Sequence, residues 1–423
     1  MNHFEERNGA LWCEDVPLAE LAEAVGTPLY VYSTATLTRH YRAFESALAA
    51  HESLGSPFIA YAVKANSNLS VLKTLGRLGA GADTVSEGEI RRALAAGIPS
   101  SRIIFSGVGK TDAELRYALE VGVAQINIEA RPEFKRLSTI ARDIGVVPQV
   151  CFRVNPDVGA GGHAKITTGS ADNKFGVSIV EAEELYAASA GAGLKAIGLA
   201  CHIGSQITDL EPLRTAFGVM RDLILRLRSR GLDVERLDLG GGLGAPYFNA
   251  PDPPSPAAFA EMAADVVGDH HLHLSFEPGR VIAANAGVLL ARVIHLNTRA
   301  DGHRFVVLDA GMNDLVRPAM YDAYHDIRGV LSRDGEHLPC DVVGPVCETG
   351  DTFARGRLMP PLQDGDLTVF MTAGAYGAVM SSEYNSRPLI PEVLVDGERW
   401  AVVRPRPTYD EMMSREPIAD WLL

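Results

Sequence analysis

The chain has 423 residues, which is long for one ordinary hydrophobic core and suits a large barrel with a second domain. Hydrophobic residues make up 47% and charged residues 22%, a globular composition, and no apolar run reaches the roughly 18 residues that span a bilayer. The formal charge of -14, without a basic block, argues against nucleic acid as the main partner.

The first residues and the cysteines indicate the compartment. Residues 1–10 are polar and show no signal pattern, so we do not expect secretion. The five cysteines are odd in number and lack CxxC spacing, which predicts neither a disulfide framework nor a zinc site. The histidines at 270, 271 and 273 match no common ligand spacing, so no metal is expected. A cytoplasmic protein without a membrane partner fits these features.

A helix over residues 36–49 precedes a regular alternation of strands and helices. Eight short β-branched runs read as strands, at 58–63, 82–85, 102–105, 125–128, 149–154, 197–202, 236–239 and 272–277. Helical segments between them cover 87–96, 112–120, 132–143, 180–190 and 212–228, and a proline-rich loop at 251–256 leads into another helix. This pattern predicts an α/β fold with a (β/α)8 TIM-type barrel over residues 36–283. A doubly wound sheet shares the alternation and is the alternative.

The character of the sequence changes after the barrel. Runs at 288–296, 305–308, 367–371 and 391–395 resemble strands separated by turn signals, with little helical periodicity between them. They predict a mostly β C-terminal domain over residues 284–423. A further strand at 29–32 lies ahead of the barrel, and we expect the N-terminal segment 1–35 to join that β domain.

The chemically useful residues fall at the ends of the predicted barrel strands, namely Lys64, Asp83, Arg153, His202, Gly240 to Gly242 and Glu277. Barrel enzymes build their sites on the face where the carboxyl ends of the strands meet. A lysine held against an apolar sheet loses solvation, so its neutral amine becomes available to form a Schiff base with an aldehyde. A solvated strand cap is the alternative interpretation of Lys64, and a structural role is the alternative for His202.

Three short motifs allow a ligand interpretation. The run GGGLG at 240–244 follows a strand, and its consecutive backbone amides could cradle a phosphate, although a tight turn explains the glycines equally well. The run lacks the GxGxxG register of a Rossmann site. The run EPGR at 277–280 places a carboxylate, a rigid turn and a cation at a strand end, which indicates either a ligand site or a structural salt bridge. The run GVGKT at 107–111 lacks the first glycine of a P-loop, so we expect no nucleotide there.

Taken in order, these motifs resemble those of a known family. They are YAVKAN (61–66), HIGSQ (202–206), GGGLG (240–244), EPGR (277–280), CETGD (347–351) and AGAYG (373–377). The order is similar to that of the pyridoxal-phosphate decarboxylases that pair an alanine-racemase-like barrel with a β domain. Within that family the chain resembles the diaminopimelate decarboxylases most closely, through RVNPD (153–157), KFG (174–176), DAGMND (309–314), RPAMYDAYH (317–325) and SEYNSR (382–387).

The resemblance implies that the cofactor is pyridoxal 5'-phosphate. Lys64 would hold it covalently, His202 would stack on the ring, and Glu277 would keep the ring nitrogen protonated so that the ring is a stronger electron sink. Asp83 and Arg153 would support the lysine and the cofactor. The cofactor-binding residues implied are Lys64, Asp83, Arg153, His202, Ser205, Gly240, Gly241, Gly242, Glu277, Gly279, Arg280 and Tyr376.

The resemblance also implies the reaction, which is decarboxylation of meso-2,6-diaminopimelate at its D centre to give L-lysine, the last step of lysine biosynthesis. The substrate is a small amino acid with two carboxylates. Arg280 and Arg317 suit the distal carboxylate because a guanidinium binds it bidentately. Tyr321, Glu348 and Tyr376 suit the other polar groups.

A third set of implications concerns the proton donor and the assembly. Cys347 resembles the family's proton donor, so the catalytic residues would be Lys64, His202 and Cys347. In that family the cysteine comes from the partner subunit, which implies a homodimer with shared active sites.

Other functions remain as alternatives. A paralogue would decarboxylate ornithine, arginine or a carboxylated polyamine precursor, but the presence of both Arg317 and Glu348 speaks against it. A racemase would use a tyrosine where the chain presents Cys347, and a simple cofactor-binding protein would not need the second domain. Two departures from the family pattern are Glu87, where a second glycine is usual, and the glycine-rich loop at 159–162.

Overall fold

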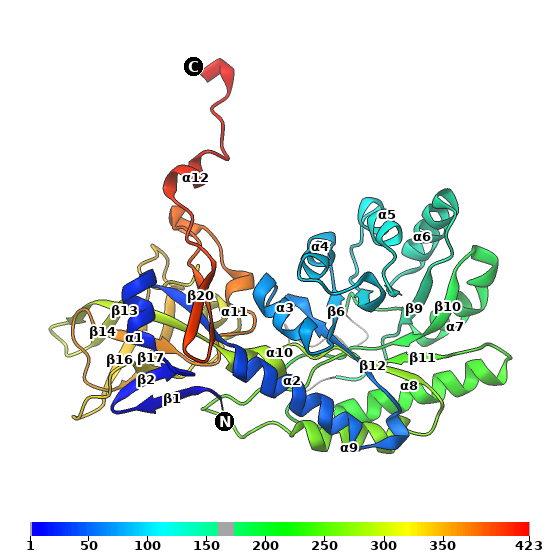
Figure 1. Ribbon diagram of the computed structural model, residues 1–423, viewed down its shortest axis with the longest axis horizontal. Helices are drawn as coiled ribbons and strands as arrows, with labels where there is room; N and C mark the ends of the chain where they lie inside the picture. Colours follow the sequence, from blue (N-terminus) through cyan, green and yellow to red (C-terminus); the bar gives the residue numbers. More distant parts are fainter. Residues whose placement is uncertain (1, 160–172, 423) are drawn as a thin grey trace. The chain divides into compact units, whose positions relative to one another are not determined.

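The computed structural model describes residues 2–159 and 173–422, and its chain divides into two compact units (Figure 1). The barrel unit consists of Leu37–Pro246 and Pro251–Ala283. The β unit consists of Met1–Thr36, Tyr247–Ala250 and Ala284–Leu423. The glycine-rich loop at 159–162 departs from the family pattern, and its residues 160–162 lie outside the described residues.

Eight parallel strands close on one another in the barrel unit. They are β5 (Phe58–Ala62), β6 (Gly81–Thr84), β7 (Ile103–Phe105), β8 (Gln125–Ile128), β9 (Gln149–Arg153), β10 (Lys195–Ala200), β11 (Arg236–Asp238) and β12 (His273–Phe276). The last strand pairs with the first through Ser275 and Phe58, so the sheet has no edge. The predicted barrel is confirmed, and the doubly wound alternative is wrong because that fold leaves two edges open.

Helices lie outside the barrel strands (Figure 1). They are α2 (Thr34–Ala49), α3 (Leu69–Arg77), α4 (Glu87–Ala95), α5 (Asp112–Val121), α6 (Arg131–Ile144), α7 (Ile179–Ala188), α8 (Glu211–Ser229), α9 (Pro256–Val267) and α10 (Arg280–Ala283). Local chemistry explains where several begin. The hydroxyls of Ser86, Ser178 and Ser255 each accept a backbone N–H from the first turn of their helix, and Thr111 forms a reciprocal capping box with Glu114.

The β unit is built around the strand that precedes the barrel in the sequence. All five residues of β4 (Leu29–Ser33) are buried, and β4 pairs antiparallel with β13 (Gly287–Thr298) and parallel with β19 (Glu392–Asp396). The expectation that this strand joins the C-terminal sheet is therefore confirmed. Its apolar residues pack into one cluster with Val288, Val369 and Val393.

The remaining elements of the β unit complete this sheet or flank it. They are β1 (Phe4–Arg7), β2 (Ala10–Cys13), β3 (Val16–Pro17), α1 (Leu18–Val25), β14 (Arg304–Leu308), α11 (Arg317–Tyr321), β15 (Ile327–Gly329), β16 (Leu338–Val343), β17 (Thr352–Met359), β18 (Leu367–Phe370), β20 (Arg399–Arg404) and α12 (Tyr409–Met413). The strands β17 and β20 end the main sheet path and were not predicted. Their alternation is obscured because half or more of their side chains are partly or fully exposed. Among the described helices, none combines the length and apolar character that crossing a bilayer requires.

Gly198 in β10 tests how tightly the barrel strands are packed. A Cβ at this position would clash with the backbone carbonyl of Arg236 on β11, whereas a Cβ at Gly218 in α8 would meet nothing within 4 Å. We expect Gly198→Ala to lower the free energy of unfolding by about 2 kcal/mol or more. Gly218→Ala should leave it unchanged or raise it by about 1 kcal/mol. Urea unfolding of both variants measures this, and equal midpoints would contradict the packing described.

Candidate active site

A cavity of about 390 Å³ opens at the carboxyl ends of the barrel strands. It is lined by Lys64, Val85, Ser106, Gly107, Val108, Gly109, Glu114, Asn127, Arg153, Phe175, Ala200, Cys201, His202 and Glu277. Four residues that the sequence singled out, Lys64, Arg153, His202 and Glu277, thus meet around one space although they come from four different strands. The closed ring of strands brings them together.

Lys64 lies in a short 3-10 turn (Val63–Ala65) directly after β5. Its Nζ donates to Oδ2 of Asp83, at 3.2 Å, and Asp83 is fully buried on β6. The second oxygen of Asp83, Oδ1, has no hydrogen-bond partner among the described residues. A buried carboxylate therefore anchors the amine at the cavity wall while the lysine side chain stays partly accessible.

Glu277 follows β12 and belongs to a group of three buried carboxyl groups with Asp83 and Asp238. Burial, followed by the neighbouring Asp238 and Asp83, raises the pKa of Glu277 well above its ordinary value. Its Oε1 is buried and finds no hydrogen-bond partner in the described part of the chain. A cationic ring N–H at this oxygen would supply the missing bond and a charge that favours the carboxylate, so the site fits the ring nitrogen of pyridoxal phosphate.

His202 follows β10 and presents a neutral ring. Burial, with the positive charges of Lys64 and Arg153, lowers the pKa of His202 well below its ordinary value. The backbone N–H of Gly241 donates to Nδ1 at 3.2 Å. Because Nδ1 accepts this bond, the proton of the neutral ring sits on Nε2. A neutral, oriented imidazole is suited to lie against an aromatic cofactor ring.

The glycine run after β11 packs too closely for any side chain. A Cβ on Gly240 would clash with the carbonyl of Cys201, and one on Gly241 would clash with the carbonyl of Glu277. Gly240 also has a φ of 63°, and its N–H donates to Oδ1 of Asp238 at 3.0 Å. The backbone amides of the run are thus held in a side-chain-free loop, a cradle that suits a phosphate.

Arg280 and Ser205 also meet within the barrel unit. Nε and Nη2 of Arg280 lie 3.2 and 3.1 Å from the hydroxyl oxygen of Ser205. Arg280 is buried at the start of α10, and a Cβ on the preceding Gly279 would press against Ala62 and Ala65. The pair adds a guanidinium and a hydroxyl, two groups that bind phosphate or carboxylate oxygens.

Arg317, Tyr321, Cys347, Glu348 and Tyr376 belong to the β unit. Arg317 is buried on α11, and its Nη1 lies 3.0 Å from Nε2 of His325. Nδ1 of His325 lies 2.9 Å from the carbonyl oxygen of Met371. A carbonyl only accepts, so Nδ1 carries the proton and Nε2 accepts from Arg317. The histidine thereby fixes the direction of the guanidinium.

Cys347 and Glu348 are exposed in a loop that a carboxylate stabilises. The two oxygens of Asp351 accept the backbone N–H groups of Met312 and Val346, at 2.6 and 2.7 Å. The N–H of Cys347 donates to the side-chain oxygen of Asn385 at 2.9 Å. The thiol is therefore presented from a loop whose backbone is fixed on both sides.

Several polar residues near the cavity were not predicted from the sequence. Glu89 accepts the N–H of Val85, which lines the cavity, at 2.8 Å. Burial raises the pKa of Glu89 from 4.5 to about 7, although its bond to Val85 works against the shift. Its spacing from Ser86 is that of a helix cap, which gives it a structural explanation in the sequence. Glu129, Glu133 and the buried Lys110 had no such pattern to reveal them.

Comparisons with known proteins agree with this geometry. Residues 34–284 match the family model described as "Pyridoxal-dependent decarboxylase, pyridoxal binding domain". The diaminopimelate decarboxylase of Zymomonas mobilis subsp. mobilis is 48% identical over 421 residues, which cover 99% of both chains.

Two solved structures are also similar. Diaminopimelate decarboxylase from Helicobacter pylori, complexed with L-lysine, has a TM-score of 0.90 at 38% identity, covering 94% of this chain and 99% of that one. Diaminopimelate decarboxylase from M. jannaschii, in co-complex with L-lysine, has a TM-score of 0.93 at 33% identity, covering 99% of each chain.

Glu89 predicts a dependence of stability on pH. A carboxyl group with a raised pKa in the folded state contributes stability at low pH that is lost as the pH rises through that value, here about 7. Between about pH 5 and about pH 8 this loss should approach 2 kcal/mol. Glu89→Gln keeps an acceptor for Val85 and has no charge to bury, so it should gain stability over the unchanged chain as the pH rises.

Urea unfolding of both proteins at the two pH values measures this difference. Glu87→Gln is the matched control, since it removes a neighbouring carboxylate whose ion pair with Arg91 lies at the surface. A stability difference between Glu89→Gln and the unchanged chain that stays constant with pH would contradict the assignment.

Proposed function

The chain belongs to the pyridoxal-dependent decarboxylases, and on that premise we propose that it converts meso-2,6-diaminopimelate to L-lysine and carbon dioxide with pyridoxal phosphate as its cofactor. The observation that carries the proposal is the cavity in which Lys64, His202 and Glu277 converge. The names printed for the relatives and the lysine in two similar structures support the same substrate.

The cofactor supplies an electron sink for the bond to the departing carboxyl group. Lys64 would provide the amine that holds the cofactor, and Asp83 keeps that amine in place. Glu277 would hold a proton at the ring nitrogen. His202, neutral and oriented by the bond from the backbone N–H of Gly241, would lie against the ring.

We assign the phosphate to the amides of Gly240 to Gly242 and Gly279, with Ser205, Arg280 and Tyr376. Tyr376 has a φ of 56°, which is uncommon for a residue with a side chain. Strained backbone of this kind is concentrated at functional sites, which supports a binding role for Tyr376.

Recognition of the distal end of the substrate falls to the β unit in this proposal. Arg317, directed by His325, would bind the distal carboxylate together with Arg280. Glu348 and Tyr321 would bind the remaining polar groups, with the acidic Glu348 placed for an ammonium. A substrate such as ornithine lacks the distal carboxylate and could not make this contact with the guanidinium of Arg317.

We further propose a cytoplasmic homodimer in which Cys347 returns the proton to the product from the partner subunit. The exposure of Cys347 and Glu348 supports this assignment, because a residue that completes a neighbouring site must be accessible from its own subunit.

The first prediction concerns substrate choice. The purified protein with added pyridoxal phosphate should form lysine and carbon dioxide from the meso isomer. It should turn over L,L-diaminopimelate, ornithine and arginine at least about a hundredfold more slowly, because each presents the wrong stereocentre or lacks the distal carboxylate. Product analysis for each substrate is the measurement. Preferred turnover of ornithine or arginine would move the chain to a paralogous function.

The second prediction concerns the shared site. Lys64→Ala and Cys347→Ala should each form little lysine alone. When subunits of the two variants are mixed and allowed to reassort, half of the dimers should be mixed, each with one intact site. Lysine formation should then recover to about a quarter of that of the unchanged protein. Recovery no greater than the sum of the separate variants would contradict a shared site.

A further inference from the structure

A buried chain of four charged residues borders the cavity. It begins at Lys110, whose side chain is fully buried. The ammonium donates to the backbone carbonyls of Gly107 and Asn127, at 2.6 and 2.8 Å, and forms an ion pair with Oε1 of Glu133 at 2.6 Å. All three N–H donors of the lysine therefore have close acceptors within the protein.

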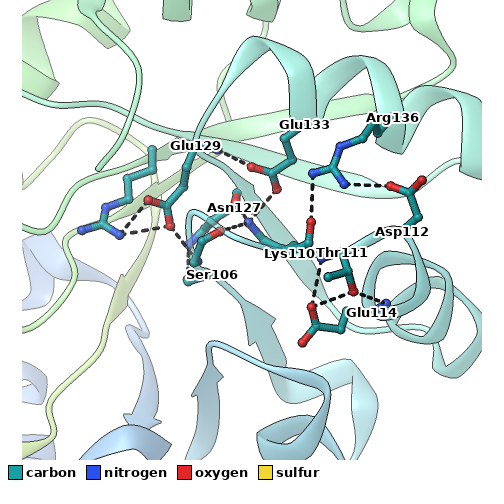
Figure 2. Close-up of polar contacts among 11 residues, drawn as sticks. Ser106, Lys110, Thr111, Asp112, Glu114, Asn127, Glu129, Glu133 and Arg136 are labelled. Carbon is teal, nitrogen blue, oxygen red and sulfur yellow. Dashed lines mark hydrogen bonds and ion pairs between the residues drawn. The ribbon is translucent and has the colours of Figure 1, made fainter. Parts of the chain in front are cut away.

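The series of charged residues continues from Glu133 on α6 to Glu129 at the end of β8 (Figure 2). The other oxygen of Glu133, Oε2, accepts the backbone N–H of Glu129 at 3.0 Å. Both residues are almost completely buried, and burial raises the pKa of Glu133 although Lys110 opposes that shift. Glu133 thus fixes the backbone from which the side chain of Glu129 extends.

Glu129 connects this series of charged residues to the cavity through Arg153. Each of its carboxylate oxygens lies 3.0 Å from Nη1 of Arg153, and Oε1 also accepts the N–H of Gly107 at 2.6 Å. Gly107 is therefore held at both ends, through its N–H by Glu129 and through its carbonyl by Lys110. Residues 106–109 and Arg153 all line the cavity, so the network determines the shape and the charge of one wall.

The charge of Arg153 matters at the cavity because it acts on His202. Nη2 of Arg153 reaches the carbonyl oxygen of His202 at 3.5 Å, and its positive charge contributes to lowering the pKa of that histidine, after burial and Lys64. Glu277 also lines the cavity, and the buried Asp83 and Asp238 lie near it. Glu129 gives the guanidinium of Arg153 a fixed counter-charge, because both of its carboxylate oxygens lie 3.0 Å from Nη1.

We propose that Glu129 is a positioning residue that fixes the guanidinium of Arg153 in the wall of the cofactor cavity, with Lys110 and Glu133 holding Glu129 and residues 106–109 in place. This inference rests on the proposed function, since it concerns the site for the pyridoxal ring. A purely structural network would contribute to stability and leave the bound cofactor unaffected.

The test is a double-mutant cycle on the cofactor-loaded protein. Glu129→Gln removes the charge and keeps an acceptor for Gly107, and Arg153→Met removes the guanidinium. Pyridoxal phosphate affinity and the pH midpoint of the absorbance of the bound cofactor are measured for both variants and for the combination. We expect Glu129→Gln to weaken cofactor binding by at least about tenfold and to shift the pH midpoint.

Because Glu129 acts through Arg153, the combined variant should bind the cofactor no more weakly than Arg153→Met alone. Glu183→Gln is the matched control. It removes a carboxylate paired with two arginines, Arg226 and Arg230, on the outside of the barrel unit, and it should bind the cofactor normally. If Glu129→Gln does not fold, Glu129→Asp keeps the charge and withdraws it by one methylene, and a smaller change in the same direction is expected.

Unchanged affinity and spectrum in a folded Glu129 variant, or fully additive losses in the combined variant, would overturn the inference. The unchanged protein serves as the reference for the proposed function. If it binds pyridoxal phosphate and forms lysine while the Glu129 variants behave like it, the positioning role fails and the proposed function stands. If the unchanged protein neither binds the cofactor nor forms lysine, the proposed function itself fails.

Discussion

Burial of charge next to an open cavity is the constraint on which the barrel unit depends. Removing an ion from water costs several kcal/mol unless a partner replaces the lost solvation. The structure meets this cost with three pairs arranged around the cavity: Lys64 with Asp83, Arg153 with Glu129, and Lys110 with Glu133. Among the residues that the structure describes, Glu277 and Asp238 form no such ion pair, and burial is the main cause that raises the pKa of both. A cationic ring beside Glu277 would therefore supply the charge that favours the ionised form of this carboxyl group.

The closed sheet explains why the partners in these pairs lie close together in space. Parallel strands present their carboxyl ends on one face, and closure makes neighbours of strands that are distant in the sequence. Asp238 on β11 and Gln125 on β8, for example, lie 3.2 Å apart through a side-chain hydrogen bond across the barrel interior. Gln125 also donates to Asn127 on the same strand, which donates in turn to Ser106 at the cavity. The polar network thus continues from the barrel interior to the site without an exposed link.

The sequence predicts the parts of this arrangement that have a local signal. Strand runs such as residues 125–128 and the capped helix after Thr111 are encoded within a few residues, and so their bounds were predicted to within about two residues. Glu129 and Lys110 have no local signal, because each is recognisable only through a partner that the fold brings close. Lys110 lies in a stretch that resembles a phosphate loop, and no periodicity distinguishes its buried ion pair from a solvated cation. The edge strands β17 and β20 were missed for a related reason, since exposure removes the alternation on which strand prediction relies.

The two units hold their polar side chains in position in different ways, and the difference affects which groups these side chains can recognise. In the barrel unit, side chains are held by charge pairs and by a glycine loop without room for a Cβ. In the β unit, Arg317 is directed by a neutral histidine whose tautomer is set by a backbone carbonyl. His325 orients the guanidinium of Arg317 through a neutral ring, whereas Glu129 places a carboxylate against the guanidinium of Arg153. Arg153, paired with a carboxylate, is suited to shaping the wall of the cavity, and Arg317, oriented by a histidine, is suited to recognising a planar anion such as a carboxylate.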